Sequence, residues 1–544
     1  MTAAMPADTR SATSRHGMVT SPHVLASQAG LDVLAAGGNA IEAAIAIACC
    51  LYVTYPHFAG LGGDAFMLIA DKAGKVHTLS GIGQAPQQLP AHSGYGGAIP
   101  LRGPQSMLTS AAAVDVLGQA FETSRDTWAG PHSWQQLLSP AIALAREGFA
   151  ISESERFWLD FRLQEAASLP GVYPAYLADG AVPAAQSLRR QPALATTLET
   201  LAARGYRDFY DGQLAATLAQ GLAQAGSPLR AADLAATRAR VEAPLSIAYR
   251  GGSLLAHRPP TQGITTLEIM GLLQRFDLQR VKEGSADYYH LLVEAVKQAF
   301  IDRNRFVADP DQVEVPVERL LSAAHLDARA QHIRMDRALP WPQPFQTGDT
   351  AFIGAADSAG NAVSMLVTVY FDWGSGVQVG DTGVLWHNRG AAFSLDPNHP
   401  NCLAPGKRPF HTLNPGMYLQ NGKPTILYGT QGADGQPQTL AAILTRMIDY
   451  GMDPYTALAR PRFLLGKTFS DARDSLKLEE DVPEDVFTEL ARRGHGLSRI
   501  PAQSPLMGHP GAIRLDPATG SMQGAHDPRS DGRALGLPEP NPAP

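Results

Sequence analysis

The most constraining feature of this sequence is the stretch 41–53, which is apolar on every side. Asn39 is placed to cap a helix over this stretch, and Glu42, three residues later, can complete a capping box. A helix without a polar face has to be buried all round. The stretch is too short to span a bilayer. We therefore expect this helix to lie in the interior of the folded protein.

Strand signals occur on both sides of further helical stretches. Apolar residues at helical spacing predict helices within 288–307 and 439–450, whereas residues 1–16 are expected to form a flexible leader. Hairpins flanked by buried helices are typical of an α+β layered fold in one compact domain. Four pairs of strand-like segments around short turns predict the hairpins: 66–70 with 76–79, 351–356 with 362–370, 417–420 with 423–428, and 511–515 with 522–526.

Composition excludes several classes of function. A formal charge of -7 over 544 residues gives no basic footprint for nucleic acid. Three cysteines cannot form a disulfide framework, and the absence of CxxC, HExxH and paired Cys/His spacings argues against a metal. The first residues lack the apolar segment of a secretory signal. We therefore expect a cytoplasmic protein with no membrane segment, no metal and no cofactor.

Short motifs spread over most of the chain resemble the γ-glutamyltransferase family. They keep the family's order and spacing from about residue 17 to 530. The resemblance implies an αββα sandwich of the N-terminal-nucleophile hydrolase type, which cuts itself into chains 1–349 and 350–544 that stay together. The matching segments are 17–23, 37–44, 56–57, 60–63, 350–363, 374–376, 381–383, 405–409 and 527–529.

The resemblance places the family's nucleophile on Thr350, counted back from the Asp-x-x-Gly-Asn-Ala-Val turn at 357–363. A threonine hydroxyl is a weak nucleophile without a base in reach. Once Thr350 is N-terminal, its own α-amine, with a reference pKa of about 7.7–8.0, can take the hydroxyl proton. Thr368 matches the family's second threonine, which hydrogen-bonds the nucleophile. Without the resemblance, Thr368 would be an ordinary β-branched strand residue.

The segment 429–435 is rich in glycine and lies between a predicted strand and a predicted helix. Such a turn can direct backbone N–H groups at a developing oxyanion. The resemblance places the family's oxyanion pair on Gly432 and Ala433. Alanine keeps the N–H donor but adds a Cβ, and without the resemblance the segment would be a plain glycine-rich turn.

The positions that hold a γ-glutamyl group in the family are different in this sequence. Replacing an ammonium-binding carboxylate by a guanidinium reverses the local charge and favours a bare anion, for which arginine offers a bidentate fork. The resemblance aligns Ile82 with an arginine, Tyr370 with an asparagine, Arg389 and Ala392 with the Gln and Asp that bind the amino group, and His411 and Thr412 with two serines.

We therefore expect Arg389 to bind a substrate carboxylate, with His411 and Thr412 as further donors. The alternative is that Arg389 pairs with a structural carboxylate, Asp396 or Asp434. Segments 388–396, 409–415 and 434–438 are similar to the branch of the family that hydrolyses oxamate to oxalate and ammonia in purine-nitrogen salvage. The leading hypothesis is a small anionic amide as substrate. A γ-glutamyltransferase or glutathione hydrolase, and a non-catalytic binding protein, remain as alternatives.

Overall fold

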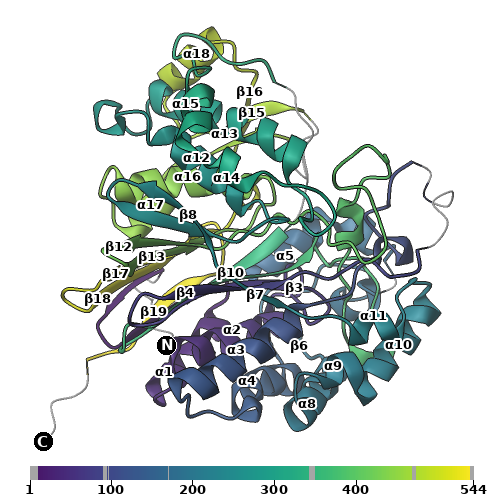
Figure 1. The fold of residues 1–544 in the computed structure, drawn as a ribbon. Coiled ribbons are helices and arrows are strands. Elements are labelled where there is room, and N and C mark those ends of the chain that lie inside the picture. The colour runs from purple at the N-terminus through teal and green to yellow at the C-terminus, as the bar shows by residue number, and fades with distance from the viewer. Residues whose placement is uncertain are drawn as a thin grey trace, which may run out of the picture.

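The computed structural model describes residues 10–89, 95, 97–169, 171–341, 349–467 and 473–539. Two seven-stranded antiparallel sheets lie face to face, and helices cover the outer face of each (Figure 1). This arrangement confirms the αββα sandwich that was expected. Within the described ranges, no helix combines the length and the apolar character needed to cross a membrane.

The first sheet, called here the β11 sheet, has the strand order β19-β2-β10-β11-β3-β4-β7. Two of the predicted hairpins, β3 with β4 and β10 with β11, belong to it. Its strands are β19 (Arg533–Gly536), β2 (Gly17–Ser21), β10 (Asp349–Asp357), β11 (Ala362–Tyr370), β3 (Asp64–Ala70), β4 (Val76–Gly81) and β7 (Arg240–Glu242).

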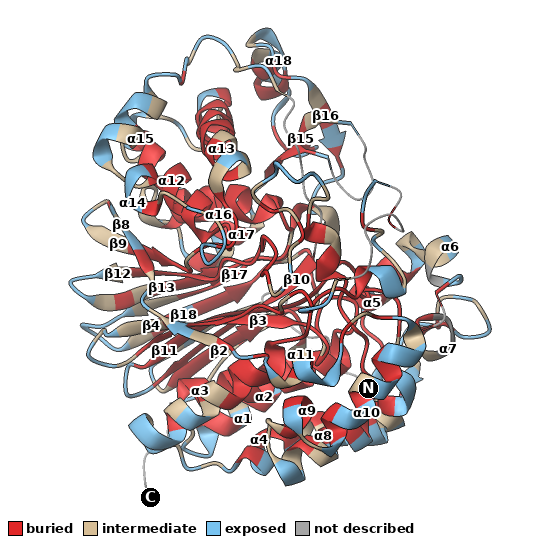
Figure 2. Ribbon diagram, turned by 45° about the vertical axis from the view of Figure 1, so that its right-hand side comes forward, coloured by how far each residue is buried: buried red, intermediate tan, exposed pale blue. Residues whose placement is uncertain are grey.

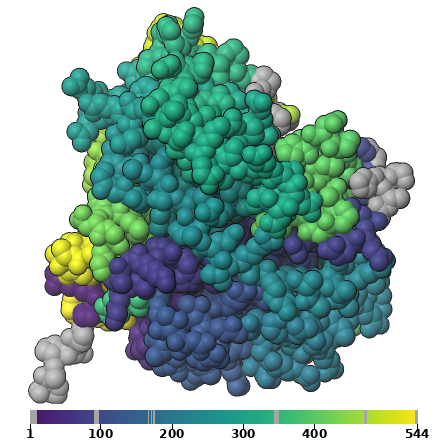
Figure 3. All heavy atoms as spheres, in the orientation of Figure 1, coloured from purple at the N-terminus to yellow at the C-terminus, as the bar shows by residue number. Residues whose placement is uncertain are grey.

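The second sheet, the β13 sheet, has the order β1-β18-β17-β13-β12-β9-β8 and contains the other two predicted hairpins. The expected flexible leader is wrong for residues 11–14, which form β1 and pair with β18 at the opposite end of the chain (Figure 3). The strands are β1 (Ser11–Ser14), β18 (Ser521–His526), β17 (Gly511–Asp516), β13 (Lys423–Gly429), β12 (Gly416–Gln420), β9 (Gly252–Ala256) and β8 (Leu245–Tyr249).

The helix predicted from the apolar stretch is α2, and every one of its residues is buried (Figure 2). Its capping box is present: the Asn39 side chain accepts from the N–H groups of Ile41 and Glu42, and the Glu42 carboxylate accepts from the Asn39 N–H. Helices on this side of the molecule are α1 (Val24–Ala35), α2 (Ala40–Thr54), α3 (Ala113–Trp128), α4 (Trp134–Glu147), α5 (Glu153–Phe161), α6 (Leu163–Ala166), α7 (Tyr173–Tyr176), α8 (Pro192–Arg204), α9 (Asp208–Asp211), α10 (Gln213–Ala225) and α11 (Ala231–Ala235).

The β13 sheet is covered by the second group of helices, with α12, α13 and α16 forming its buried centre. Two small sheets, β14-β15-β16 and β5-β6, lie outside the sandwich. The helices are α12 (Gly263–Leu273), α13 (Ala286–Phe306), α14 (Val317–Leu320), α15 (Ala323–Ala330), α16 (Gly435–Ile448), α17 (Pro454–Ala459) and α18 (Glu484–Arg492). The remaining strands are β14 (Phe463–Gly466), β15 (Ser475–Glu479), β16 (Leu497–Ile500), β5 (Phe149–Ala150) and β6 (Leu188–Arg189).

The two sheets bring separate parts of the chain together at one end of the sandwich. Strand β10 starts at Asp349, opposite the last residue of β11, Tyr370. The turn that leads into β3 lies against this corner so closely that a Cβ on Gly63 would be 2.0 Å from the Thr368 carbonyl oxygen. Glycine is therefore required at position 63 for the backbone of β11 to take its place.

Candidate active site

Thr350 lies at the start of β10 and is 1% exposed. Its hydroxyl oxygen accepts a hydrogen bond of 3.1 Å from the side-chain amide of Gln436. Gln436 is in the first turn of α16, and its carbonyl oxygen accepts from the N–H of Asn414. The Thr350 hydroxyl is thus held by a glutamine from the helical layer that covers the β13 sheet. No motif in the sequence singled out this residue.

Thr368 lies beside Thr350 on β11, but its hydroxyl donates to the carbonyl oxygen of Asp349, not to the Thr350 hydroxyl. The Thr368 oxygen in turn accepts from the N–H of Tyr370 at 2.7 Å, which orients its proton away from that amide. In this continuous chain the second threonine therefore polarises the carbonyl of the bond between Asp349 and Thr350.

The Asp349 side chain is buried in an acidic environment. Gln431 donates to one of its carboxyl oxygens, while the other has no hydrogen-bond partner among the described residues. Burial, reinforced by the nearby Asp372, raises the pKa of the Asp349 carboxyl well above its ordinary value. Asp372 is itself held by Arg162 at 2.7 Å and Arg102 at 3.2 Å. No local sequence pattern indicates this group, because its members come from five separate segments of the chain.

The turn after β13 has the backbone expected of an anion-binding turn. Gly432 has φ 124° and Ala433 has φ 45°, so the alanine adopts the left-handed conformation in spite of its Cβ. Neither N–H group donates to another residue that the structure describes. The Ala433 carbonyl accepts from the Gln262 amide at 2.7 Å, which fixes the turn from behind. Both donors therefore remain available to a ligand.

Arg389 is fully buried, and none of its guanidinium nitrogens has a hydrogen-bond partner within the described part of the chain. The guanidinium carbon lies 3.8 Å from the centre of the Tyr370 ring, and burial lowers the Arg389 pKa to about 10. The alternative partners are engaged elsewhere: Asp434 pairs with Arg303 at 2.8 Å, and the exposed Asp396 accepts from a backbone N–H. Arg389 thus presents an unpaired buried cation.

Asp64, the first residue of β3, is the buried carboxylate near Arg389. It accepts hydrogen bonds from the N–H groups of Gly83 and Ala112 and from His411 Nε2 at 3.2 Å, and His387 Nδ1 is 3.6 Å away. Burial alone would raise the Asp64 pKa, but the two histidines and Arg389 hold it below its ordinary value. Asp64 is therefore a charged, fully coordinated support.

His411 and Thr412 are both buried, yet they differ from the donors that were expected. Burial, helped by Arg389, lowers the His411 pKa to about 3, so its single N–H points to Asp64 while Nδ1 accepts from the Leu413 N–H. Thr412 offers its carbonyl to Gln262, and its hydroxyl forms no hydrogen bond with another described residue. Thr412 keeps a free donor, whereas His411 is already occupied.

Ile82 and Ala392 are both buried apolar residues. Ile82 packs with Phe66, Phe352, Leu366 and Leu413 in a small core next to the site. A hydrocarbon side chain at this position cannot bind a carboxylate. The described residues contain two groups with metal-ligand chemistry, His290 with Glu294 and His495, and Glu268 with Asp302 and His325, and neither includes a residue of this site.

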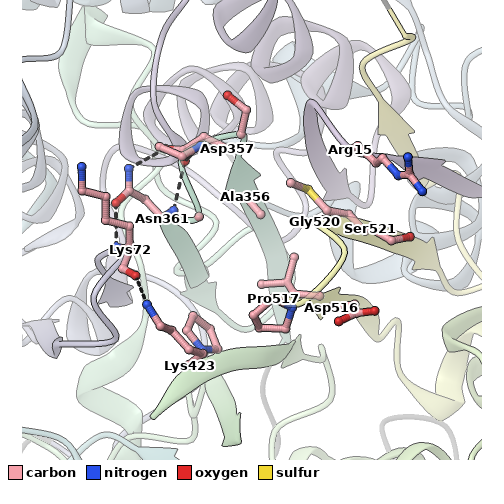
Figure 4. A pocket seen from close by; sticks show the side chains of 16 residues that line it. Arg15, Lys72, Ala356, Asp357, Asn361, Lys423, Asp516, Pro517, Gly520 and Ser521 are labelled. Atoms are coloured by element: carbon pink, nitrogen blue, oxygen red, sulfur yellow. Dashed lines mark hydrogen bonds between the residues drawn. The ribbon is translucent and has the colours of Figure 1, made fainter. Parts of the chain in front are cut away.

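A pocket at the opposite end of the sandwich is unrelated to this site. It is lined by the turn between β10 and β11, with Asp357 and Asn361, and by Lys72 and Lys423 (Figure 4). Because a strand rises about 3.3 Å per residue, the β10 end of this pocket lies roughly 20 Å from Thr350. The chemistry-bearing side chains are at the other end of the strand.

The family model described as gamma-glutamyltranspeptidase matches residues 26–537. The chain belongs to this family. It is 42% identical to the oxamate amidohydrolase proenzyme of Klebsiella pneumoniae subsp. pneumoniae, over 96% of this chain and 99% of the relative. It is 40% identical to the glutathione hydrolase-like YwrD proenzyme of Bacillus subtilis, over 96% and 98%.

Among solved structures, the cephalosporin acylase from Bacillus halodurans matches with a TM-score of 0.89 and 33% identity, covering 98% of both chains. This likeness extends over both sheets and both helical layers, as expected of the N-terminal-nucleophile hydrolase fold. The protein is therefore a self-processing amidohydrolase of the γ-glutamyltranspeptidase family, and the non-catalytic alternative is wrong.

The Asp64→Asn substitution should destabilise the precursor by about 3 kcal/mol at pH 7, because an amide cannot accept from all three donors and leaves Arg389 without a nearby negative charge. The folded Asp64 pKa is below its unfolded value, so this contribution is present above about pH 4 and is lost as the pH falls through the folded pKa. Urea unfolding of the uncleavable Thr350→Ala chain, with and without the second change, measures the difference.

The exposed Asp396 offers a matched control, since Asp396→Asn should leave the free energy of unfolding nearly unchanged. Equal stability of the Asp64→Asn and parent chains between pH 5 and 8 would contradict a structural role for the charge.

Proposed function

We propose that Thr350 is the N-terminal nucleophile of this amidohydrolase and that its substrate is a small anionic amide, represented by oxamate. The observation that carries the proposal is the buried, unpaired guanidinium of Arg389. A buried guanidinium without hydrogen-bond acceptors is strongly unfavourable, and a bound carboxylate would supply the missing hydrogen bonds together with a directly paired charge. The similarity to an oxamate amidohydrolase proenzyme supports the same substrate.

Maturation follows from the contacts of the bond between Asp349 and Thr350. The Thr350 hydroxyl attacks the Asp349 carbonyl carbon, which the Thr368 hydroxyl polarises. The C–N bond breaks as the hydroxyl proton passes to the nitrogen, and an ester remains. Water then hydrolyses the ester, releasing chain 1–349 with a new carboxylate and chain 350–544 with a free amine on Thr350. The two chains remain associated.

Turnover uses the same atoms with the amine as base. The Thr350 amine takes the hydroxyl proton, the oxygen attacks the substrate amide carbon, and the N–H groups of Gly432 and Ala433 stabilise the oxyanion. Ammonia leaves with the proton from the amine, and water hydrolyses the acyl ester to give a dicarboxylate. Arg389 binds the substrate carboxylate through the fork that suits a planar anion, with the Thr412 hydroxyl as a further donor.

A glutathione hydrolase activity is the second candidate, favoured by the similarity to a glutathione hydrolase-like proenzyme. A γ-glutamyl group carries an α-ammonium, which would meet the charge of Arg389. The nearby carboxylate, Asp64, is already occupied by two backbone N–H groups and His411. The charge distribution therefore favours an anion without an amino group.

The Thr350→Ala precursor should remain a single chain, because it has no hydroxyl to attack Asp349. Wild-type protein should give two fragments on a denaturing gel, and N-terminal sequencing of the smaller one should start at Thr350. Any other first residue would show that the nucleophile is assigned to the wrong position.

Thr368→Val should slow self-cleavage roughly fivefold to tenfold, because a hydrogen bond to the scissile carbonyl contributes on the order of 1 kcal/mol or somewhat more. Thr368→Ser keeps the hydroxyl and is the matched control, which should cleave at nearly the wild-type rate. A time course of precursor loss compares the three chains. Equal rates for valine and threonine would reduce Thr368 to a strand residue.

Arg389→Lys and Arg389→Ala should lower kcat/KM for oxamate roughly tenfold to hundredfold, since a charge-assisted contact contributes about 1.5–3 kcal/mol. Self-cleavage should continue in both. Ammonia release from oxamate gives the constants, and Arg250→Lys, whose arginine pairs with Asp449 near the turn between β8 and β9, is the control. Unchanged constants would remove Arg389 from the substrate site, and preference of the wild type for a γ-glutamyl anilide would overturn the substrate.

A further inference from the structure

Three helices of the layer over the β13 sheet bring two carboxylates and an imidazole together. Glu268 is on α12, Asp302 on α13 and His325 on α15. Glu268 and Asp302 are buried, whereas the His325 side chain is 18% exposed and opens the group to solvent. One potential ligand atom from each residue lies within 4.8 Å of the other two. None of these residues has a part in the proposed reaction.

We propose that Glu268, Asp302 and His325 bind a divalent transition-metal ion, with Zn²⁺ as the representative ion. His325 Nε2 is 2.8 Å from Asp302 Oδ2 and 4.0 Å from Glu268 Oε1. Zinc bonds of about 2.0–2.2 Å place neighbouring ligand atoms of a tetrahedron roughly 3.3–3.6 Å apart. Shifts of less than about 1 Å in side-chain position would form three of the four bonds, and water supplies the fourth.

Glu268 provides an independent sign that a cation belongs here. Its Oε2 atom is buried and has no hydrogen-bond partner among the described residues. Two carboxylates, Glu268 and Asp302, are balanced by the single guanidinium of Arg329, which binds Asp302 at 2.8 Å. The group therefore has one more carboxylate than guanidinium groups. The Glu268 carboxylate approaches His325 through Oε1, 4.0 Å from Nε2, and its Oε2 atom has no partner among the described residues, so this side chain can accept a cation.

The existing contacts are compatible with binding. Asp302 Oδ2 now accepts from His325 Nε2–H, and in the loaded site the same lone pair would bind the metal. The imidazole proton moves to Nδ1, which frees the Nε2 lone pair as a ligand. Arg329 stays on Asp302 and orients it, as charged neighbours of metal-bound carboxylates do.

The other group, His290 with Glu294 and His495, does not share these features. The Lys297 ammonium already lies 2.7 Å from a Glu294 oxygen. His290 is hydrogen-bonded to His495 at 2.8 Å and to the Arg334 carbonyl at 2.8 Å. Its charges and its polar atoms are satisfied within the protein, so it serves as an internal control.

A metal at this position would stabilise the support of the Gly432–Ala433 turn. Gln262 directly precedes α12 and donates to the Ala433 carbonyl, and its own carbonyl accepts from Arg303 at 3.3 Å. Arg303 follows Asp302 in α13 and pairs with Asp434. Joining α12 to α13 through a cation thus fixes the two residues that hold the turn. The effect is structural and does not depend on the substrate assigned above.

The test uses full-length protein treated with a chelator and then titrated with Zn²⁺ by calorimetry and by thermal unfolding. Wild type should bind one ion and unfold at a higher temperature with it. Glu268→Gln and His325→Asn should bind about tenfold more weakly or worse and lose the temperature shift. His495→Gln should bind as the wild type does.

Glu268→Gln also separates loss of a ligand from loss of the fold. It removes a buried carboxyl without changing its shape, so the metal-free variant should be at least as stable as the metal-free wild type. Co²⁺ added to the wild type should give the visible absorption of a tetrahedral nitrogen and oxygen site, absent in the variant. No saturable binding by the wild type, or equal binding by Glu268→Gln, would overturn the proposal.

Discussion

Strand β10 is buried over its whole length, and its placement determines the rest of the architecture. One of its faces packs on α2, which is itself apolar all round, and the other faces the β13 sheet. A strand that is buried on both faces requires a packed layer on each side of its sheet. The β13 sheet is one of these layers, and its other face needs a second helical layer to cover it. Thr350, the proposed nucleophile, is the second residue of that strand, so its position is fixed by the most constrained element of the core.

Much of this fold could be predicted from local patterns, because hairpins and helices depend on residues close in sequence. The α2 capping box and the four hairpins are examples. Strand β1 was missed because residues 11–14 have no apolar alternation and become a strand only by pairing with β18. Gln436 and Gln431 were missed for a related reason: an amide in a helix or turn becomes a contact of Thr350 or Asp349 only through the fold.

The charges around Arg389 decide which group could pair with its guanidinium, a question that the amino-acid exchange at this position left open. The exchange to arginine at this position indicated a change of ligand charge, but it left two partners open for the guanidinium. In the structure, Asp434 pairs with Arg303 and Asp396 accepts from a backbone N–H. Asp64, which was not among the expected partners, accepts a hydrogen bond from His411. A histidine that looked like a substrate donor thereby becomes part of the support, while Thr412 keeps its hydroxyl available.

The order of strands has a consequence for how the processed protein behaves on dilution. Each sheet combines strands from the two sides of Thr350: in one, β2 lies between β19 and β10, and in the other, β1 pairs with β18 and β9 with β12. Two chains cut at that point would share both sheets of the sandwich, so separating them would break the hydrogen bonds of both sheets. Their association would then be a property of folding, insensitive to concentration, and fragments from different molecules would not exchange without unfolding.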